Sequence, residues 1–199
     1  KYKTTLDISN GFFSHNLDSE SRDLTAFSAL GFQQRFTRLP MGYKNSPGLF
    51  SARIVSVLHD IDPDAFSYID DIYLTDDSLN DHLARVDRII LEFAALGYRF
   101  NFQKSHIACL SVIFLGYELS CEGKSLAPQF LEKCALLHPP DTLKRLQSLL
   151  GFLNFGRTYI PDYALRIKPL YDLLHPSFSG SAWTAGHTEI LRSLQSDLL

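Results

Sequence analysis

The stretch that decides the fold reads Ala65-Phe66-Ser67-Tyr68-Ile69-Asp70-Asp71-Ile72-Tyr73-Leu74. Its β-branched and aromatic residues are typical of strands, and aspartate tolerates tight turns, so we expect two strands joined by a turn at Asp70-Asp71. Two like charges inside an apolar run cost stability unless positive charge meets them. A pair of divalent metal ions would supply that charge and points to phosphate chemistry.

Asp7 is the natural partner of this pair, because it ends a second apolar run. Residues 4–8 read as a strand, closed by the turn residues Asn10-Gly11. If the two strands are neighbours in one sheet, Asp7 and Asp70 can face the same point, as a site for ions about 3.5–4 Å apart requires. The alternative is that Asp7 caps a turn and Asp70-Asp71 forms an ordinary hairpin tip.

The rest of the chain predicts an α+β part over 1–120 and an all-helical part over 128–199. Ser46-Pro47 is expected to open a helix with Ser46 as N-cap, and Ser78 to cap a helix that ends at Gly97. Further strands are expected at 24–27, 32–39, 98–102 and 112–119, a helix-compatible turn at 18–23, and helices at 128–138, 142–159, 162–174 and from 185 to the end.

Composition permits a folded core and narrows the partners. The 199 residues are 45% hydrophobic and 13% aromatic, with a net charge of −3, and no apolar run approaches the ~20 residues that span a bilayer. Residues 1–97 carry a net charge of −5 and residues 98–199 a net +2, which suits metal binding in the first part and a polyanion contact in the second. The three widely spaced cysteines are interpreted as reduced thiols of an intracellular protein.

Four motifs occur in a fixed order. They are Leu6-Asp7-Ile8-Ser9-Asn10-Gly11-Phe12-Phe13, Arg38-Leu39-Pro40-Met41-Gly42-Tyr43-Lys44-Asn45-Ser46-Pro47, Tyr68-Ile69-Asp70-Asp71 and Phe114-Leu115-Gly116-Tyr117. Together they resemble the reverse transcriptases of retroviruses and LTR retroelements, most of all the foamy-virus-like branch. The resemblance implies a polymerase palm, an antiparallel sheet with packed helices, over 1–120. It further implies a helical thumb over 121–175 and the start of a connection segment over 176–199, with the fingers subdomain absent.

The same resemblance implies roles for residues around the aspartates. Asp7, Asp70 and Asp71 would be catalytic and, with the backbone carbonyl of Ile8, would bind two Mg²⁺ ions, with Mn²⁺ as the alternative. The deoxynucleoside triphosphate would be bound by Ser9, Asn10, Gly11, Phe12, Met41 and Lys104. Phe12 would exclude a 2′-hydroxyl, and Lys104 would protonate the departing pyrophosphate. A core aromatic and a solvated surface lysine are the alternatives for these two.

Template and primer contacts are implied by the same comparison. They would come from Gly42, Lys44, Asn45, Ser46, Pro47, Tyr68, Phe114, Leu115, Gly116, Tyr117, Gln147, Gly151 and Phe155. The last three recur every four residues, so they share one face of a helix, while Leu146, Leu149, Leu150 and Leu153 would pack in the core. Met41 departs from the glutamine usual at its position in retroviral enzymes, so we expect altered nucleotide affinity or sugar discrimination.

The function implied is that of an RNA-directed DNA polymerase core, acting on an RNA or DNA template with a DNA primer. The alternative is a catalytically inactive, truncated derivative that binds nucleic acid or serves as a scaffold. We expect the rest of a Pol polyprotein in the parent, no membrane contact, and an intracellular location, in the cytoplasm or a virus-like particle.

Overall fold

The structure is a computed structural model that describes all residues, 1–199. It consists of two compact units. Unit 1 comprises Lys1–Phe114 and Leu119–Lys124, and unit 2 comprises Leu115–Glu118 and Ser125–Leu199. The short segment Leu115–Glu118 therefore belongs to unit 2, although the residues on both sides of it belong to unit 1. The assignment of 1–120, 121–175 and 176–199 to palm, thumb and connection stays a prediction.

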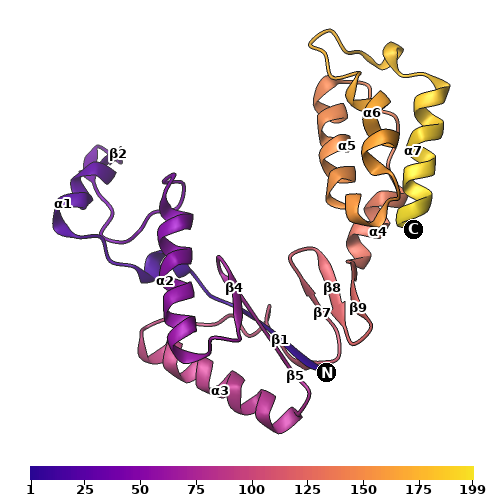
Figure 1. Ribbon diagram of the computed structural model, residues 1–199. Coiled ribbons are helices and arrows are strands. Elements are labelled where there is room, and N and C mark those ends of the chain that lie inside the picture. Colours follow the sequence, from indigo (N-terminus) through magenta and orange to yellow (C-terminus); the bar gives the residue numbers. More distant parts are fainter. The chain divides into compact units, whose positions relative to one another are not determined.

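Unit 1 is built on a four-stranded antiparallel sheet, as the α+β pattern predicts (Figure 1). Its strands, in the order β4-β5-β1-β6, are β4 (Phe66–Tyr68), β5 (Asp71–Asp76), β1 (Tyr2–Asp7) and β6 (His106–Cys109). The expected neighbourhood of the two aspartate-bearing strands is confirmed, because β1 pairs with β5. Leu6, Ile72 and Leu74 of these strands are almost fully buried in the core.

Two long helices of unit 1 contact the sheet and each other. Helix α2 (Ser46–Ile61) packs Phe50, Ile54, Val57 and Leu58 into the core, and α3 (Leu79–Ala95) packs Val86, Ile89 and Phe93 there. The Ser78 side chain accepts the Asp81 N–H as the expected N-cap, and Gly97 follows α3 at φ 88°. The expectation for α2 was wrong by one residue. Asn45 is the N-cap, and the buried Ser46 hydroxyl instead donates to the Pro40 carbonyl at 2.7 Å.

The turn between β4 and β5 also differs by one residue from the prediction. Tyr68 pairs with Asp71, so the two turn residues are Ile69 and Asp70. Ile69 adopts φ 53°, in the left-handed region where a β-branched side chain is strained. Propensity pointed to Asp-Asp because isoleucine is a poor residue for such a turn, and the sheet register overrides that preference.

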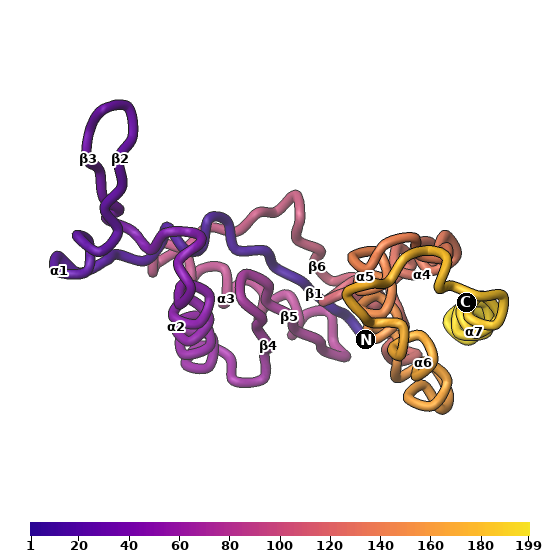
Figure 2. The backbone as a smooth tube through the Cα atoms, turned by 90° about the horizontal axis from the view of Figure 1, so that it is seen from above, coloured from indigo at the N-terminus to yellow at the C-terminus, as the bar shows by residue number.

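Residues 11–34 of unit 1 form short elements beside the N-terminal end of α2. They are the 3-10 helix η1 (Gly11–Ser14), α1 (Ser19–Arg22), the 3-10 helix η2 (Asp23–Thr25), and the hairpin of β2 (Phe27–Ala29) and β3 (Phe32–Gln34). In Figure 2 this hairpin extends away from the sheet. The expected strand at 24–27 therefore starts later, because residues 23–25 form η2.

The segment after α3 contains both a missed strand and a weaker one than expected. β6 was not predicted, and residues 98–102 form only a bridge, between Phe100 and Ile8. A three-stranded sheet follows, with β7 (Val112–Phe114), β8 (Tyr117–Ser120) and β9 (Gly123–Leu126).

Unit 2 is helical, as predicted. It holds α4 (Pro128–Ala135), α5 (Leu143–Phe155), η3 (Arg157–Tyr159), α6 (Tyr163–Tyr171), η4 (Gly180–Ala182) and α7 (Ala185–Leu198). The expected leucines of α5 lie in its core with Leu170, Leu191 and Leu194. No helix of the chain combines the length and the apolar character needed to cross a bilayer.

A network of buried charges ties α2 and α3 to β5 within unit 1. Arg85 donates through Nε and Nη2 to both oxygens of Asp62, at 2.7 and 2.9 Å, and also pairs with Asp76. His82, which is fully buried, contacts Asp76 through Nδ1 at 2.6 Å and the Thr4 hydroxyl through Nε2 at 2.7 Å. Through Thr4, this network also holds β1, the strand that ends at Asp7.

Candidate active site

Asp7, Asp70 and Asp71 meet at one end of the unit 1 sheet. Asp7 is the last residue of β1 and lies opposite Asp71, the first residue of β5. The Ile8 N–H donates to the Asp70 carbonyl at 2.8 Å, which fixes the strained turn against the end of β1. The structure therefore brings together the three carboxylates that the sequence singled out, from two strands and one turn.

The electrostatics of this cluster favour an added positive charge. Burial raises the pKa of Asp70, and repulsion from Asp7 and then Asp71 raises it further. Burial and then the charge of Asp7 likewise raise the pKa of Asp71. The positive charge of Lys104 opposes both effects but is outweighed. Asp70 Oδ1 is buried without any hydrogen-bond partner, an arrangement that proteins avoid unless the atom has another use.

The carboxylate oxygens of this cluster and the nearby backbone carbonyls fit a hard divalent cation whose remaining ligands come from a bound substrate. Carboxylate and carbonyl oxygens are what Mg²⁺ prefers, and it is usually bound by one or two carboxylates together with substrate phosphates. No three His, Cys, Asp or Glu side chains of the chain are arranged so that they could together hold one metal ion, so the aspartates alone do not complete a metal site. The orphaned Asp70 Oδ1 is the oxygen most in need of a ligand.

Among the residues expected at the nucleotide, Gly11 lies directly beside Asp70. A Cβ on Gly11 would stand 2.4 Å from the Phe50 ring and 2.9 Å from Asp70 Oδ1, so only glycine fits there. Phe12 packs on Phe50 with ring centroids 5.1 Å apart. Asn10 has φ 51°, and the Ser9 N–H donates to the Arg99 carbonyl at 2.7 Å, so that one amide is used within the fold.

The second motif leads from the nucleotide residues into α2. Met41 is 59% exposed, Gly42 has φ 85°, and Lys44, Asn45 and Pro47 are exposed at the start of the helix. Ser46 is buried through its bond to Pro40, so it has a structural use whatever its part in template binding.

The predicted contacts in unit 1 with template and primer lie at the hairpins. Tyr68 is half exposed at the end of β4. Phe114 is instead buried, with its ring 5.3 Å from that of Tyr73 and 6.0 Å from that of Phe66. It therefore supports the sheet rather than presenting a free ring.

Unit 2 brings together three of the predicted primer residues. Tyr117 stacks on Phe155 with centroids 4.9 Å apart, and a Cβ on Gly116 would lie 2.8 Å from the same ring. Leu115 precedes them with φ 51°. Gln147 and Gly151 lie exposed on the face of α5 that also carries Phe155, opposite the buried leucines.

Two supporting residues were missed by the sequence. Ser105 Oγ accepts the Asp7 N–H at 3.1 Å and donates to the Asn101 carbonyl at 2.8 Å, which holds the backbone of Asp7. Phe50, a core residue of α2, is also the ring against which Gly11 and Phe12 pack. No local pattern marks either role, because each depends on a contact distant in sequence.

The amino-acid sequence matches one family. The model of the family described as "Reverse transcriptase (RNA-dependent DNA polymerase)" matches residues 1–119, and this chain belongs to that family. Among its relatives is the Pro-Pol polyprotein of Simian foamy virus type 3 (strain LK3), 42% identical over 200 residues, covering 100% of this chain and 17% of that protein. The Pol polyprotein of the transposon opus from Drosophila melanogaster is 33% identical over 87% of this chain and 17% of its own length.

Solved structures agree. A foamy viral protease-reverse transcriptase in complex with double-stranded DNA superposes with a TM-score of 0.91 at 38% identity, covering 100% of this chain and 35% of that one. The same type of protein in complex with an RNA/DNA hybrid also gives 0.91 at 38% identity, over 100% of this chain and 27% of that one. The resemblance to foamy-virus reverse transcriptases is thus confirmed. The chain spans about a sixth of the curated relatives it matches.

Proposed function

We propose that this chain is the catalytic core of an RNA-directed DNA polymerase, which extends a DNA primer by transfer of a nucleotidyl group from a deoxynucleoside triphosphate. The observation that carries the proposal is the cluster of Asp7, Asp70 and Asp71 with its orphaned oxygen. Burial and neighbouring carboxylate charge raise the pKa of Asp70 and of Asp71, so a cation would stabilise the cluster, and triphosphate chemistry supplies one with its substrate.

Asp7, Asp70 and the Ile8 carbonyl would hold two Mg²⁺ ions, or Mn²⁺ in their place, with Asp71 as the neighbouring carboxylate. Bound there, the ions supply charge stabilisation on the attacking and leaving oxygens of the displacement. The primer 3′-oxygen forms a bond to the α-phosphorus, the bond to pyrophosphate breaks, and the hydroxyl proton leaves to solvent. The contribution of the chain is to hold the carboxylates in register through β1, β5 and the Ile8–Asp70 hydrogen bond.

Nearby residues have roles that suit a nucleotide in this place. Lys104 is close enough to affect the pKa of both Asp70 and Asp71, so its ammonium group can donate a proton to the leaving pyrophosphate. Phe12, fixed against Phe50, would sit beneath the sugar and disfavour a 2′-hydroxyl. Met41 is exposed and offers the ribose only an apolar contact.

The template and primer are proposed as the nucleic-acid partners, because the structural neighbours are complexes with double-stranded DNA and an RNA/DNA hybrid. In unit 2, the exposed Gln147 and Gly151 give α5 a face with a hydrogen-bonding group and a close-approach position. The relatives are parts of Pol polyproteins, so we propose a Pol parent for this chain and an intracellular site of action.

The test is primer extension on an RNA template with Mg²⁺ or Mn²⁺. Wild type should extend the primer, Asp70→Asn should lose at least about a hundredfold in rate, and Asp60→Asn, which removes an exposed carboxylate of the same unit, should keep it. Equal extension by wild type and Asp70→Asn would refute the metal site. Salt-dependent duplex binding without any incorporation by wild type would favour the non-catalytic alternative.

A further inference from the structure

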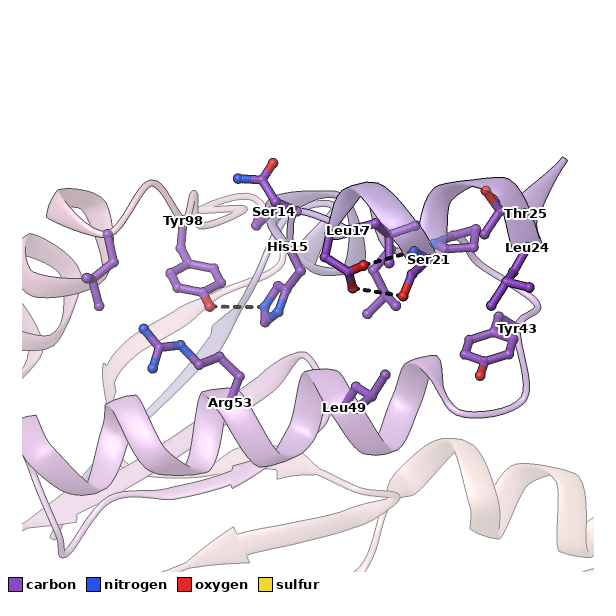
Figure 3. A pocket seen from close by; sticks show the side chains of 15 residues that line it. Ser14, His15, Leu17, Ser21, Leu24, Thr25, Tyr43, Leu49, Arg53 and Tyr98 are labelled. Carbon is purple, nitrogen blue, oxygen red and sulfur yellow. Dashed lines mark hydrogen bonds between the residues drawn. The ribbon is translucent and has the colours of Figure 1, made fainter. Parts of the chain in front are cut away.

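A pocket of about 620 Å³ lies in unit 1, bordered by η1, α1, the first half of α2 and Tyr98 (Figure 3). Its size is in the range of pockets that bind small organic molecules, about 300–1,000 Å³. None of the residues assigned above to metal, nucleotide, template or primer lines it. The pocket is therefore separate from the proposed active site.

The pocket has an apolar body and a cluster of polar groups at one end. Leu17, Leu39 and Leu49 contribute to the apolar wall. At the polar end, the Tyr98 hydroxyl and His15 Nε2 form a hydrogen bond of 3.0 Å, and Arg53 projects from α2 on the side of Tyr98 (Figure 3). Such a division is typical of sites for amphipathic ligands, in which a few polar groups fix the orientation.

At the polar end, His15 and Tyr98 are packed in place and the imidazole is neutral. The His15 ring packs edge-on against Phe50 with centroids 5.2 Å apart, and Tyr98 is only 7% exposed. Burial, and then the charge of Arg53, lower the pKa of His15, so near pH 7 it offers hydrogen bonding without charge. A ligand would meet groups already in place, which lowers the cost of ordering on binding.

Arg53 is the uncompensated charge of this pocket. The other charged side chain that lines it, Asp18, is occupied as the N-cap of α1, accepting from the Ser21 N–H at 2.9 Å and from its hydroxyl at 2.8 Å. Arg53 is exposed and has no carboxylate oxygen within 4.0 Å, and it also lines a second hollow together with Asp60 and Glu92. Its guanidinium instead lies beside the Tyr98 hydroxyl.

We propose that this pocket binds a small organic acid, with its anionic group on Arg53 and the Tyr98 hydroxyl, which His15 Nε2 holds in place, and with its apolar body against the leucines. A guanidinium can receive a carboxylate through two parallel hydrogen bonds, and the tyrosine hydroxyl adds a third donor. An apolar body of one or two rings fits the remaining volume. The proposal does not depend on polymerase activity.

The test uses 2-naphthoate as the probe, with 2-naphthalenemethanol as its neutral counterpart, titrated into the 199-residue chain by calorimetry and by saturation-transfer NMR. No metal, nucleotide or template is present, so failure here and failure of the proposed function are separate results. The acid should bind, and the alcohol should bind at least about tenfold more weakly, since a charge-assisted hydrogen bond is lost.

Three variants locate the binding. Arg53→Met should weaken the acid at least about tenfold while leaving the alcohol unchanged, and Arg53→Lys should restore part of the loss. Leu49→Trp, which changes a half-exposed pocket residue on α2, should fill the space and abolish binding of both compounds. Arg192→Met, which removes an exposed charge in unit 2, is the matched control and should bind as wild type does.

Two results would overturn the proposal. One is the absence of naphthoate binding to wild type at millimolar concentration. The other is equal binding of the acid by wild type and Arg53→Met, or by wild type and Leu49→Trp, in protein whose far-UV circular dichroism matches wild type. If Arg53→Met fails to fold, Tyr98→Phe replaces it, since it removes one donor of the polar end: it should weaken binding of the acid and leave the alcohol unchanged, and equal binding of the acid by wild type and Tyr98→Phe would overturn the proposal.

Discussion

Replacement of Arg85 by methionine tests whether the charge network beneath the sheet stabilises unit 1. The Asp62 side chain is 3% exposed and the Arg85 side chain 21%, so water cannot replace the lost hydrogen bonds. Breaking a buried ion pair by removing one partner costs about 3–5 kcal/mol, and here the buried Asp62 carboxylate would keep only the longer contact with Arg88. A domain has about 5–15 kcal/mol of stability in all, so this single change would remove a large part of it.

Arg88 provides the matched control. It lies 3.4 Å from the same Asp62 oxygen but is 53% exposed, and exposed pairs contribute about 1 kcal/mol or less. Arg88→Met should therefore cost much less than Arg85→Met. The double variant Asp62→Asn, Arg85→Met should recover part of the loss, because the buried charge of Asp62 is then absent, while Asp76 keeps its contact with His82.

The effect should depend on pH. The hydrogen bonds from Arg85 hold the pKa of Asp62 below its ordinary value, which is about 3.9 in an unfolded chain. The stabilisation is thus complete above about pH 4 and is lost as the pH falls through the lower pKa of the folded state. The gap between wild type and Arg85→Met should narrow below about pH 4.

Urea unfolding followed by far-UV circular dichroism measures these differences. Trp183, the single tryptophan, belongs to unit 2, so its fluorescence provides an internal reference that Arg85→Met should leave nearly unchanged. A loss below about 1 kcal/mol for Arg85→Met at pH 7, or a loss equal to that of Arg88→Met, would refute the reasoning.

Three further predictions concern the active site and one hairpin. Gly11→Ala should lower the free energy of unfolding in urea by about 1–3 kcal/mol and reduce primer extension, because its Cβ would collide with Phe50 and Asp70 Oδ1. Gly48→Ala is the control: it has open space around it and should stabilise α2 by about 0.5–1 kcal/mol. Asp70→Asn should raise the melting temperature at pH 7 in a chelating buffer, since the raised pKa of Asp70 is a penalty that grows as the pH rises from about 4; a fall would contradict it. Mg²⁺ should raise the melting temperature of wild type but not that of Asp70→Asn. Leu30→Asn should stabilise by up to about 1 kcal/mol, because Leu30 is 91% exposed at φ 54° and asparagine tolerates that conformation; a destabilisation measured in urea would count against it.

The helices and the paired strands could be predicted because local signals coincide with the final contacts. The Ser78 cap, Gly97 and the apolar spacing of α5 each act within a few residues. Strand β6 could not be predicted in this way. Its pairing with β1 depends on Thr4 Oγ, which accepts the Ala108 N–H at 3.0 Å across 104 positions of sequence.

The site was predictable to the extent that its residues follow each other along the chain. Asp7 and Asp70-Asp71 occur in recognisable motifs. Ile69, however, has a low propensity for its left-handed turn conformation, which the register of β4 and β5 imposes. No sequence pattern predicts the pocket that η1, α1 and α2 border. His15, Arg53 and Tyr98 lie in three separate segments and only the folded chain brings them together.

The stacking of Tyr117 on Phe155 has a mechanical consequence. The hairpin tip at residues 115–118 belongs to the helical unit, although its flanking strand β7 belongs to the sheet unit. A rotation of the helices would therefore carry Gly116 and Tyr117 along, and bending would concentrate in the hairpin strands on either side of them. For the proposed polymerase, this coupling means that the hairpin tip moves with the helices of unit 2 and not with the sheet of unit 1.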